Sequence, residues 1–112
     1  MVKYIAYEVR IYESGTREWL ARGKFHRQDG PAIERVDGTK FWYLNGRQHR
    51  ENGPAVEYPD GAKWWYLNGK LHREDGPAIE NQDGEDSWFL NDEKVTQRDV
   101  MDAKLKRVNS NA

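Results

Sequence analysis

Hydrophobic residues in this chain come in short runs separated by glycine. β-Branched and aromatic residues fill the segments 31–36, 39–44, 54–59, 62–67, 77–82 and 85–90. Glycines recur every seven or eight residues between Gly15 and Gly84, and most follow Asp or Asn, the residues that turns with positive φ prefer. The pattern predicts strands of about five or six residues joined into hairpins at Asp-Gly. The Gly-Pro steps are different: proline cannot donate to a β ladder, so they open a strand after a loop.

The same pattern returns with a period of 23 residues. A fixed period in this range is typical of repeat proteins, in which each unit buries its apolar face only against its neighbours. We divide the single domain 1–112 into a degenerate N-terminal unit 1–25, full repeats 26–48, 49–71 and 72–94, and a C-terminal cap 95–112. The residues that keep strict register are Trp19, Trp42, Trp65 and Trp88; His26, His49 and His72; and Pro31, Pro54 and Pro77.

Successive repeats superpose by translation if each contributes two strands and an irregular connection through the Asn-Gly-x-x-His-Arg-x-x-Gly-Pro segment. The chain is therefore predicted to be all-β: an elongated, single-sheet antiparallel meander of hairpins. Strands lie about 4.8 Å apart, so each repeat advances about 10 Å and four hairpins form a twisted ribbon roughly 40 Å long. A triangular solenoid with three short strands per coil is the competing geometry.

Two pairing registers are open for each Asp-Gly hairpin. A two-residue loop places Ile33 opposite Trp42, whereas a one-residue bulge at Gly38 places Ala32 opposite Trp42. In both registers one face carries the tryptophan row with the leucines two positions on, which we interpret as the structural spine. The other face varies between repeats and is a candidate partner surface, because Tyr and Trp dominate binding hot spots. Its residues are Phe41, Tyr43, Trp64, Tyr66 and Phe89.

The two ends of the array have the features of caps. Thr96 and Asp99 match a capping box and Val95 with Val100 a hydrophobic staple, so we expect a short helix over 97–107 that covers the last hairpin. At the other end, residues 1–9 alternate as a strand. An open meander leaves this edge unpaired, so we expect a homodimer through the terminal strand or a partner bound along it.

The amino-acid composition excludes several kinds of chemical site. There is no cysteine, which removes disulfides, thiolate metal sites and a cysteine nucleophile, and a cytoplasmic location fits. No segment is apolar enough for a signal peptide or a membrane span. The three histidines lie about 10 Å apart and cannot share one metal ion with bonds of about 2 Å. Repetition also offers no unique catalytic constellation, so we expect no catalytic residue, metal or cofactor.

The net charge is −1 overall, but the last full repeat is strongly acidic. Residues 72–94 hold eight acidic and two basic side chains, a net charge of −6. A chain without a basic surface is not expected to bind nucleic acid or anionic membranes. A docking patch for a basic protein is the functional interpretation, and its residues are Glu80, Asp83, Glu85, Asp86, Asp92 and Glu93.

The motif Asn-Gly-Lys-Leu-His-Arg-Glu-Asp-Gly-Pro-Ala-Ile-Glu, followed by Asp-Gly and Trp, resembles the MORN repeat, with alanine in place of the second glycine of Gly-x-Gly. The resemblance covers residues 7 to about 94. The resemblance implies a scaffolding or protein-binding role. The motif is also similar to variants in bacterial and bacteriophage proteins, some of which are host-directed inhibitors of bacterial immunity.

We therefore predict that the chain is a non-enzymatic protein–protein interaction module. If the chain is phage-encoded, its partner is expected to be a host protein. The alternative is a small-ligand or nucleotide sponge. In that alternative, Arg27, Arg50 and Arg73 clamp a phosphorylated molecule, since arginine forks suit phosphate.

Overall fold

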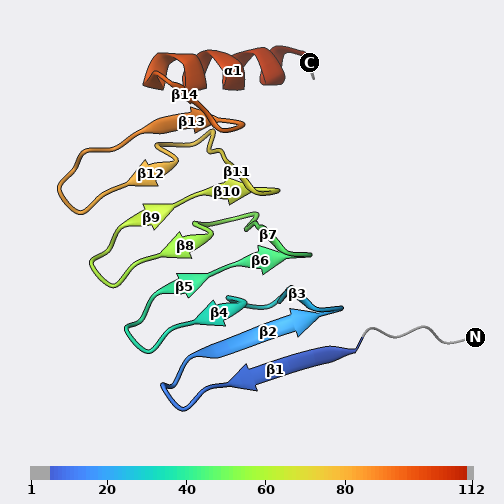
Figure 1. Cartoon of the computed structure of the whole chain (residues 1–112). Helices are drawn as coiled ribbons and strands as arrows, with labels where there is room; N and C mark the ends of the chain where they lie inside the picture. Colours follow the sequence, from blue (N-terminus) through green and yellow to red (C-terminus); the bar gives the residue numbers. More distant parts are fainter. Residues whose placement is uncertain (1–5, 111–112) are drawn as a thin grey trace, which may run out of the picture.

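A computed structural model describes residues 6–110, the side chains of residues 109 and 110 excepted. Its main feature is one open, eight-stranded antiparallel sheet followed by a single helix, α1 (Gln97–Ser110) (Figure 1). The order along the sheet follows the chain, as predicted for a meander. Its strands are β1 (Tyr7–Ile11), β2 (Arg17–Ala21), β4 (Ile33–Glu34), β5 (Lys40–Phe41), β8 (Val56–Glu57), β9 (Lys63–Trp64) and β12 (Ile79–Glu80), with β3 (Lys24–Phe25) paired to β2.

The sheet forms a single layer without a packed second layer, apart from α1 at one end. The radius of gyration is 16.4 Å, whereas a compact chain of this length would have about 13 Å. The three-sided solenoid is not formed, because the sheet stays open. Each repeat is therefore held mainly by the repeats on either side of it.

The connection between repeats is more regular than predicted. Asn45 and Gly46 both have positive φ, 52° and 79°, as in a type I′ turn. They join a second hairpin, which forms a two-stranded sheet of its own, so that only the His-Arg-x-x-Gly-Pro part lacks strand pairing. The extra hairpins are β6 (Tyr43–Leu44) with β7 (Arg47–Gln48), β10 (Tyr66–Leu67) with β11 (Lys70–Leu71), and β13 (Trp88–Leu90) with β14 (Glu93–Val95).

The bulged register is the one that forms. Ile33 pairs with Phe41 and Val56 with Trp64, so the register with Ile33 opposite Trp42 is wrong. The reason lies in the turn. Gly38, at φ 96°, donates its N–H to the carbonyl of Arg35, whose own N–H is bonded to the carbonyl of Thr39. This three-residue loop with a left-handed glycine is a standard alternative to the two-residue turn.

Full burial is restricted to small side chains. Ala32, Ala55 and Ala78, which follow the prolines of the three loops, are 0% exposed, and Val56 is 1% exposed. The tryptophans of the predicted spine are only half-buried. A single layer of sheet can enclose a methyl group under a loop, but it cannot cover an indole ring with other strands.

Helix α1 begins as predicted and ends three residues later than predicted. Thr96 Oγ1 accepts a hydrogen bond from the N–H of Asp99 (3.1 Å), and Asp99 Oδ2 accepts one from the N–H of Thr96 (3.0 Å). These reciprocal bonds form the capping box. Val100, the inner residue of the predicted staple, is 2% exposed.

The buried position of Val56 leads to a stability prediction. Val56→Ala should lower the free energy of unfolding by about 2 kcal/mol, because it removes two buried methyl groups and leaves a cavity. Val36→Ala is the matched control, since Val36 is 73% exposed in an Asp-Gly turn. Denaturant unfolding measures both. Equal stability of the two variants would contradict the central position of Val56.

Candidate functional site

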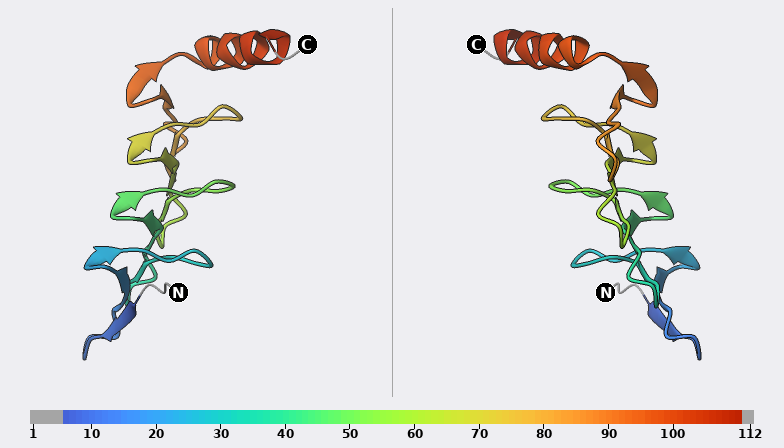
Figure 2. Two further views of the ribbon diagram at one scale, coloured as in Figure 1. Left: turned by 90° about the vertical axis from the view of Figure 1, so that its right-hand side faces the viewer. Right: turned by 90° about the vertical axis from the view of Figure 1, so that its left-hand side faces the viewer.

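Three loops project from the same side of the sheet at the spacing of one repeat. They comprise residues 26–31, 49–54 and 72–77, and helix α1 extends beside them in the same direction (Figure 2). Thr96, one period after Arg73, stands where a fourth loop would begin. The helix therefore takes the place of the missing fourth loop.

Each loop is held by an arginine that lies flat on a tryptophan. The guanidinium carbons of Arg27, Arg50 and Arg73 lie 3.9, 4.0 and 3.8 Å from the ring centroids of Trp19, Trp42 and Trp65, respectively. Such stacking of a cation on an indole face is stabilising, and more so when water is partly excluded.

The opposite side of each guanidinium faces the loop glycine. A Cβ placed on Gly53 would lie 2.8 Å from the guanidinium carbon of Arg50, so any other residue at this position would push the guanidinium group out of its place on the indole ring. Arg50 Nη1 also donates to the carbonyl of Pro54 (3.2 Å) and to Glu57 (3.1 Å). Arg27 and Arg73 make the same bonds to the equivalent proline and glutamate. Three directions of each arginine are thus occupied within the protein.

The histidines join each loop to the second hairpin of its own repeat. Nδ1 of His26, His49 and His72 accepts the backbone N–H of the turn asparagine in that hairpin, Asn45, Asn68 and Asn91, at 2.9, 2.8 and 3.1 Å. An Nδ1 that accepts a hydrogen bond leaves the ring proton on Nε2. In the second loop Nε2 lies 2.9 Å from Glu51. Within the described residues, no group of three or more His, Asp or Glu side chains is arranged for a metal ion.

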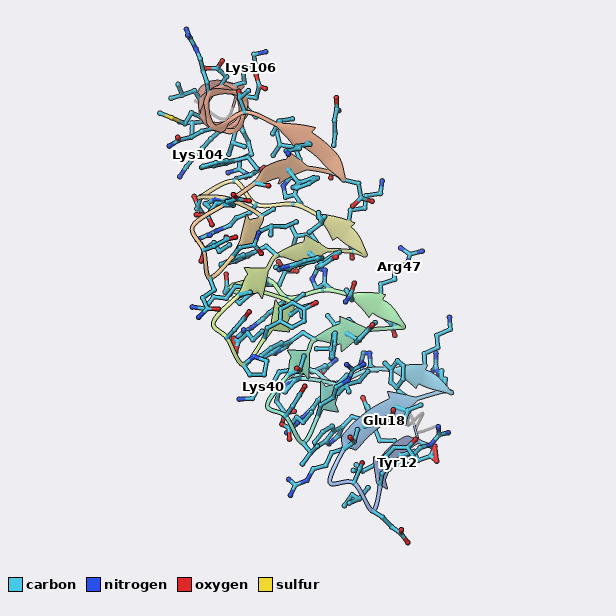
Figure 3. All side chains as sticks on the ribbon, turned by 60° about the vertical axis from the view of Figure 1, so that its left-hand side comes forward. Tyr12, Glu18, Lys40, Arg47, Lys104 and Lys106 are labelled. Atoms are coloured by element: carbon cyan, nitrogen blue, oxygen red, sulfur yellow. The ribbon has the colours of Figure 1, made fainter. Side chains whose placement is uncertain are left out.

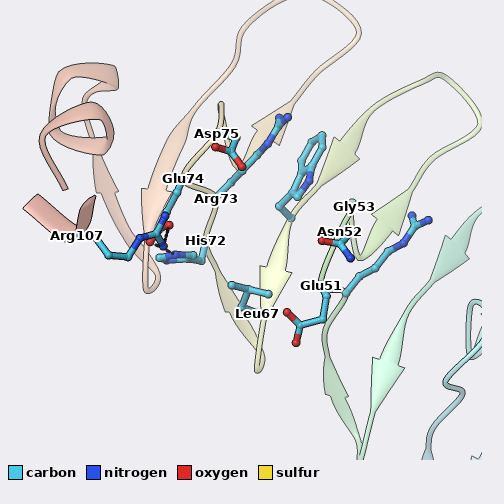
Figure 4. Close-up of a pocket in the computed structure, with 11 residues that line it drawn as sticks. Glu51, Asn52, Gly53, Leu67, His72, Arg73, Glu74, Asp75 and Arg107 are labelled. Atoms are coloured by element: carbon cyan, nitrogen blue, oxygen red, sulfur yellow. Dashed lines mark ion pairs between the residues drawn. The ribbon is translucent and has the colours of Figure 1, made fainter. Parts of the chain in front are cut away.

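Successive loops enclose grooves on the face that carries the tryptophans. The first groove, about 540 Å³, has Trp42 and Leu44 on its floor. The second, about 410 Å³, has Trp65 and Leu67 on its floor and reaches Arg107 of α1 (Figure 4). The floors are apolar, and the rims carry charged residues of the loops. These two grooves are the candidate site.

A third groove, between the last loop and α1, shows how a helix lies on this face. It is lined by Trp88 together with Val100, Met101 and Leu105 of the helix. Lys104 Nζ pairs with Asp75 (2.6 Å), and Arg107 pairs with Glu74. The contact therefore combines an indole, an aliphatic stripe and two ion pairs between basic helix residues and acidic loop residues.

The predicted aromatic surface lies on the opposite face and is half-buried throughout. Phe41 and Trp64 flank the buried Val56, and the Trp64 ring makes an edge contact with Tyr58 at 5.9 Å between centroids. Burial raises the pKa of the Tyr43 and Tyr66 hydroxyls above the ordinary value. The structure thus places Phe41, Tyr43, Trp64, Tyr66 and Phe89 among packed side chains, not on a freely exposed surface.

The structure divides the predicted acidic patch into three parts. Asp83, Glu85 and Asp86 lie in the turn between β12 and β13, whereas Asp92 lies in the turn at the opposite end of β13 and Glu93 begins β14 (Figure 1). Glu80 is bound to Arg73 at 2.6 Å. Strand β13 separates residues that are close in sequence, because consecutive turns of a meander lie at opposite edges of the sheet.

Sequence reasoning missed the rims of the grooves. Glu51 and Glu74 were not selected, although both directly follow the His-Arg pair that marks each loop. A cue was present in the motif, since residues at a fixed offset from a repeated loop must line up along one side of a translational array.

The arginine stack predicts a specific stability loss. Arg50→Lys keeps the charge but removes the planar group, so the free energy of unfolding should fall by about 1 to 2 kcal/mol. Arg47→Lys, in the same repeat, is the control, because Arg47 is exposed at the Asn-Gly turn (Figure 3) and makes no ion pair within the described residues. Thermal unfolding compares the two. A larger loss for Arg47→Lys would refute the stack as the loop's anchor.

The contacts of α1 predict a pH dependence. The hydrogen bond from Lys104 lowers the pKa of Asp75, and the bond with the backbone of Thr96 lowers that of Asp99. A carboxyl group with a lowered folded pKa stabilises the fold above its unfolded pKa of about 3.9 and loses this effect as the pH falls through the folded value. Helix docking should therefore weaken below about pH 4.

NMR of the Val100 methyl groups during an acid titration tests this effect. In the double variant Asp75→Asn/Asp99→Asn, the acid-induced transition of the Val100 methyl signals should disappear. The control is Asp102→Asn, on the same helix and without a hydrogen bond within the described residues, and its methyl signals should titrate like those of the wild type. An unchanged titration in the double variant would show that other groups control docking.

Comparison with protein-family models, curated proteins and solved structures yields no match. Within residues 6–110, no helix is both long enough and apolar enough to span a membrane. The functional argument therefore rests on the geometry of the loops, the grooves and the helix.

Proposed function

We propose that the chain is a non-enzymatic protein-binding module whose loop grooves receive a basic amphipathic helix of a partner protein. The observation that carries this proposal is the position of α1. The same face already holds a helix: α1 forms one wall of the third groove, which Trp88 and the buried Val100 line, and ion pairs from Lys104 and Arg107 join it to the last loop. This contact defines the chemistry expected of an occupant.

The open grooves keep the components that α1 uses. Each has a tryptophan and a leucine on its floor. Each of the first two loops retains one of the two acids that bind α1: Asp29 corresponds to Asp75, and Glu51 corresponds to Glu74. Asp29 already pairs with Arg27 at 3.2 Å and Glu51 lies 2.9 Å from His49, but their side chains are 89% and 75% exposed, so both remain accessible to a partner's cations.

The surface area supports a binding role. The accessible surface is 8000 Å², whereas a compact protein of this mass would expose about 6400 Å². The difference is about the total area that a standard protein–protein interface buries. A chain that keeps this much additional surface, with regular grooves on one face, is suited to binding over an extended area.

The phosphate-clamp alternative has less support. The guanidinium groups of Arg27, Arg50 and Arg73 already stack on indole rings and donate to proline carbonyls and glutamates. A phosphate would have to displace these bonds. In the host-directed setting that the motif resemblance implies, the occupant would be a helix of a basic host protein.

A matched pair of peptides tests the proposal. Both are tryptophan-free amphipathic helices with the same apolar stripe; one carries lysines and the other glutamates on the flanks. Binding is followed by fluorescence of the groove tryptophans. The basic peptide should bind, more weakly at high salt because its ion pairs are screened, and the acidic peptide should not bind.

Variants locate the contact. Asp29→Lys/Glu51→Lys reverses two groove charges and should weaken binding of the basic peptide about tenfold. Asp83→Lys/Glu85→Lys makes the same change in the turn between β12 and β13 and should leave binding unchanged. If only the second variant weakens binding, the acidic turn is the contact. If neither peptide binds, the groove proposal is wrong.

A further inference from the structure

The outer edge of β1 is a strand edge without a partner among residues 6–110. β1 pairs with β2 on its inner side over all five residues. The turn that joins the two strands is secured by a hydrogen bond from the Tyr12 hydroxyl to Glu18 at 2.7 Å (Figure 3). The edge is therefore a straight, well-supported segment at the end of the sheet opposite to α1.

The pairing with β2 determines which backbone groups face outward. Tyr12 donates its N–H to Thr16, so the even-numbered residues of this strand are hydrogen-bonded to β2. In an antiparallel pair the bonded residues alternate. The N–H and C=O groups of Tyr7, Val9 and Ile11 consequently point away from the sheet, ready to bond to another strand.

The side chains of the same three residues form an exposed apolar row. Tyr7, Val9 and Ile11 are 59%, 50% and 72% exposed and lie on one face. Glu8 and Arg10 lie on the other face, where they form an ion pair at 3.1 Å. An exposed edge strand with an apolar row is a template for strand pairing unless it is covered.

We propose that β1 pairs antiparallel with β1 of a second copy, around a two-fold axis at Val9. In this register Val9 lies opposite Val9 of the second copy, and Tyr7 lies opposite its Ile11. Glu8 lies opposite its Arg10, so that two cross-strand ion pairs form. The outward N–H and C=O groups of each strand meet those of the other, giving six backbone hydrogen bonds.

Charge selects this register over its neighbours. The bonding pattern allows only shifts of two residues, because a shift of one would place bonded groups opposite unbonded ones. One such shift places Glu8 opposite Glu8 of the second copy, and the other places Arg10 opposite Arg10. Like charges directly opposite each other are destabilising. The sequence Tyr-Glu-Val-Arg-Ile is thus complementary to itself in one register only.

The geometry of the pair keeps the grooves free. A two-fold axis through an antiparallel strand pair runs perpendicular to the sheet, so the loops of both copies project from the same side. The contact spans five residues per copy, which is small for an interface. We therefore expect a dissociation constant on the order of 10 to 100 µM.

Sedimentation equilibrium of the full chain over a range of about 1 to 1000 µM tests the dimer. The wild type should change from monomer to dimer across this range. Val9→Pro should remain monomeric yet folded, because its missing N–H faces outward and breaks no bond to β2. Circular dichroism below the dimer concentration verifies the fold of each variant.

Charge exchange provides the sharper test. Glu8→Arg and Arg10→Glu should each weaken the dimer at least tenfold, because each places like charges opposite one another. The double variant Glu8→Arg/Arg10→Glu should restore the wild-type dissociation constant. An equimolar mixture of the two single variants should form heterodimers.

A wild type that stays monomeric at about 1 mM overturns the proposal. So does a dimer that survives Val9→Pro, or a double variant as weak as the single ones. These outcomes are independent of peptide binding in the grooves, which lie on the face of the sheet and not at its edge.

Discussion

The stacking of arginine on tryptophan in each loop is the interaction on which the rest of the structure depends. A single-layer sheet cannot bury an indole under other strands, so each repeat uses its own loop as cover. Arg50 shows the arrangement fully. Its guanidinium group has Trp42 on one side and Gly53 on the other. The carbonyl of Pro54 and the carboxylate of Glu57 accept hydrogen bonds from it. The guanidinium group keeps its hydrogen bonds while it excludes water from the ring.

This constraint explains why the loops have a fixed composition. The arginine must reach back over the strand, glycine must let it approach, and proline must present a carbonyl without needing a ladder partner. The alanine that follows is completely buried beneath the loop. Loops that are held in this way stand at regular intervals, and regular intervals between projecting loops are what create the grooves. The site is thus a consequence of how the sheet covers its aromatic residues.

Much of the fold could be predicted from the sequence, because the 23-residue period, the Asp-Gly turns and the Thr96–Asp99 box are local signals. The register could not, since it depends on whether Gly38 adopts the left-handed conformation within a bulge, and the sequence permits either turn. The site was predicted less well. Composition grouped Asp83 with Asp92, but the strand between them separates the two turns. It also could not show that α1 would lie beside the loops, because that position follows from the direction in which the last strand ends.

The bond from each turn asparagine to the histidine of the same repeat has a consequence for how such a chain can change its length. Every such link lies within one 23-residue unit, with the same partners each time. Removing or duplicating one unit therefore leaves every remaining link intact, since the histidine and its asparagine are removed or duplicated together. Segment duplication could add one groove at a time while both terminal caps stay unaltered, so the reach of the array is adjustable in whole steps.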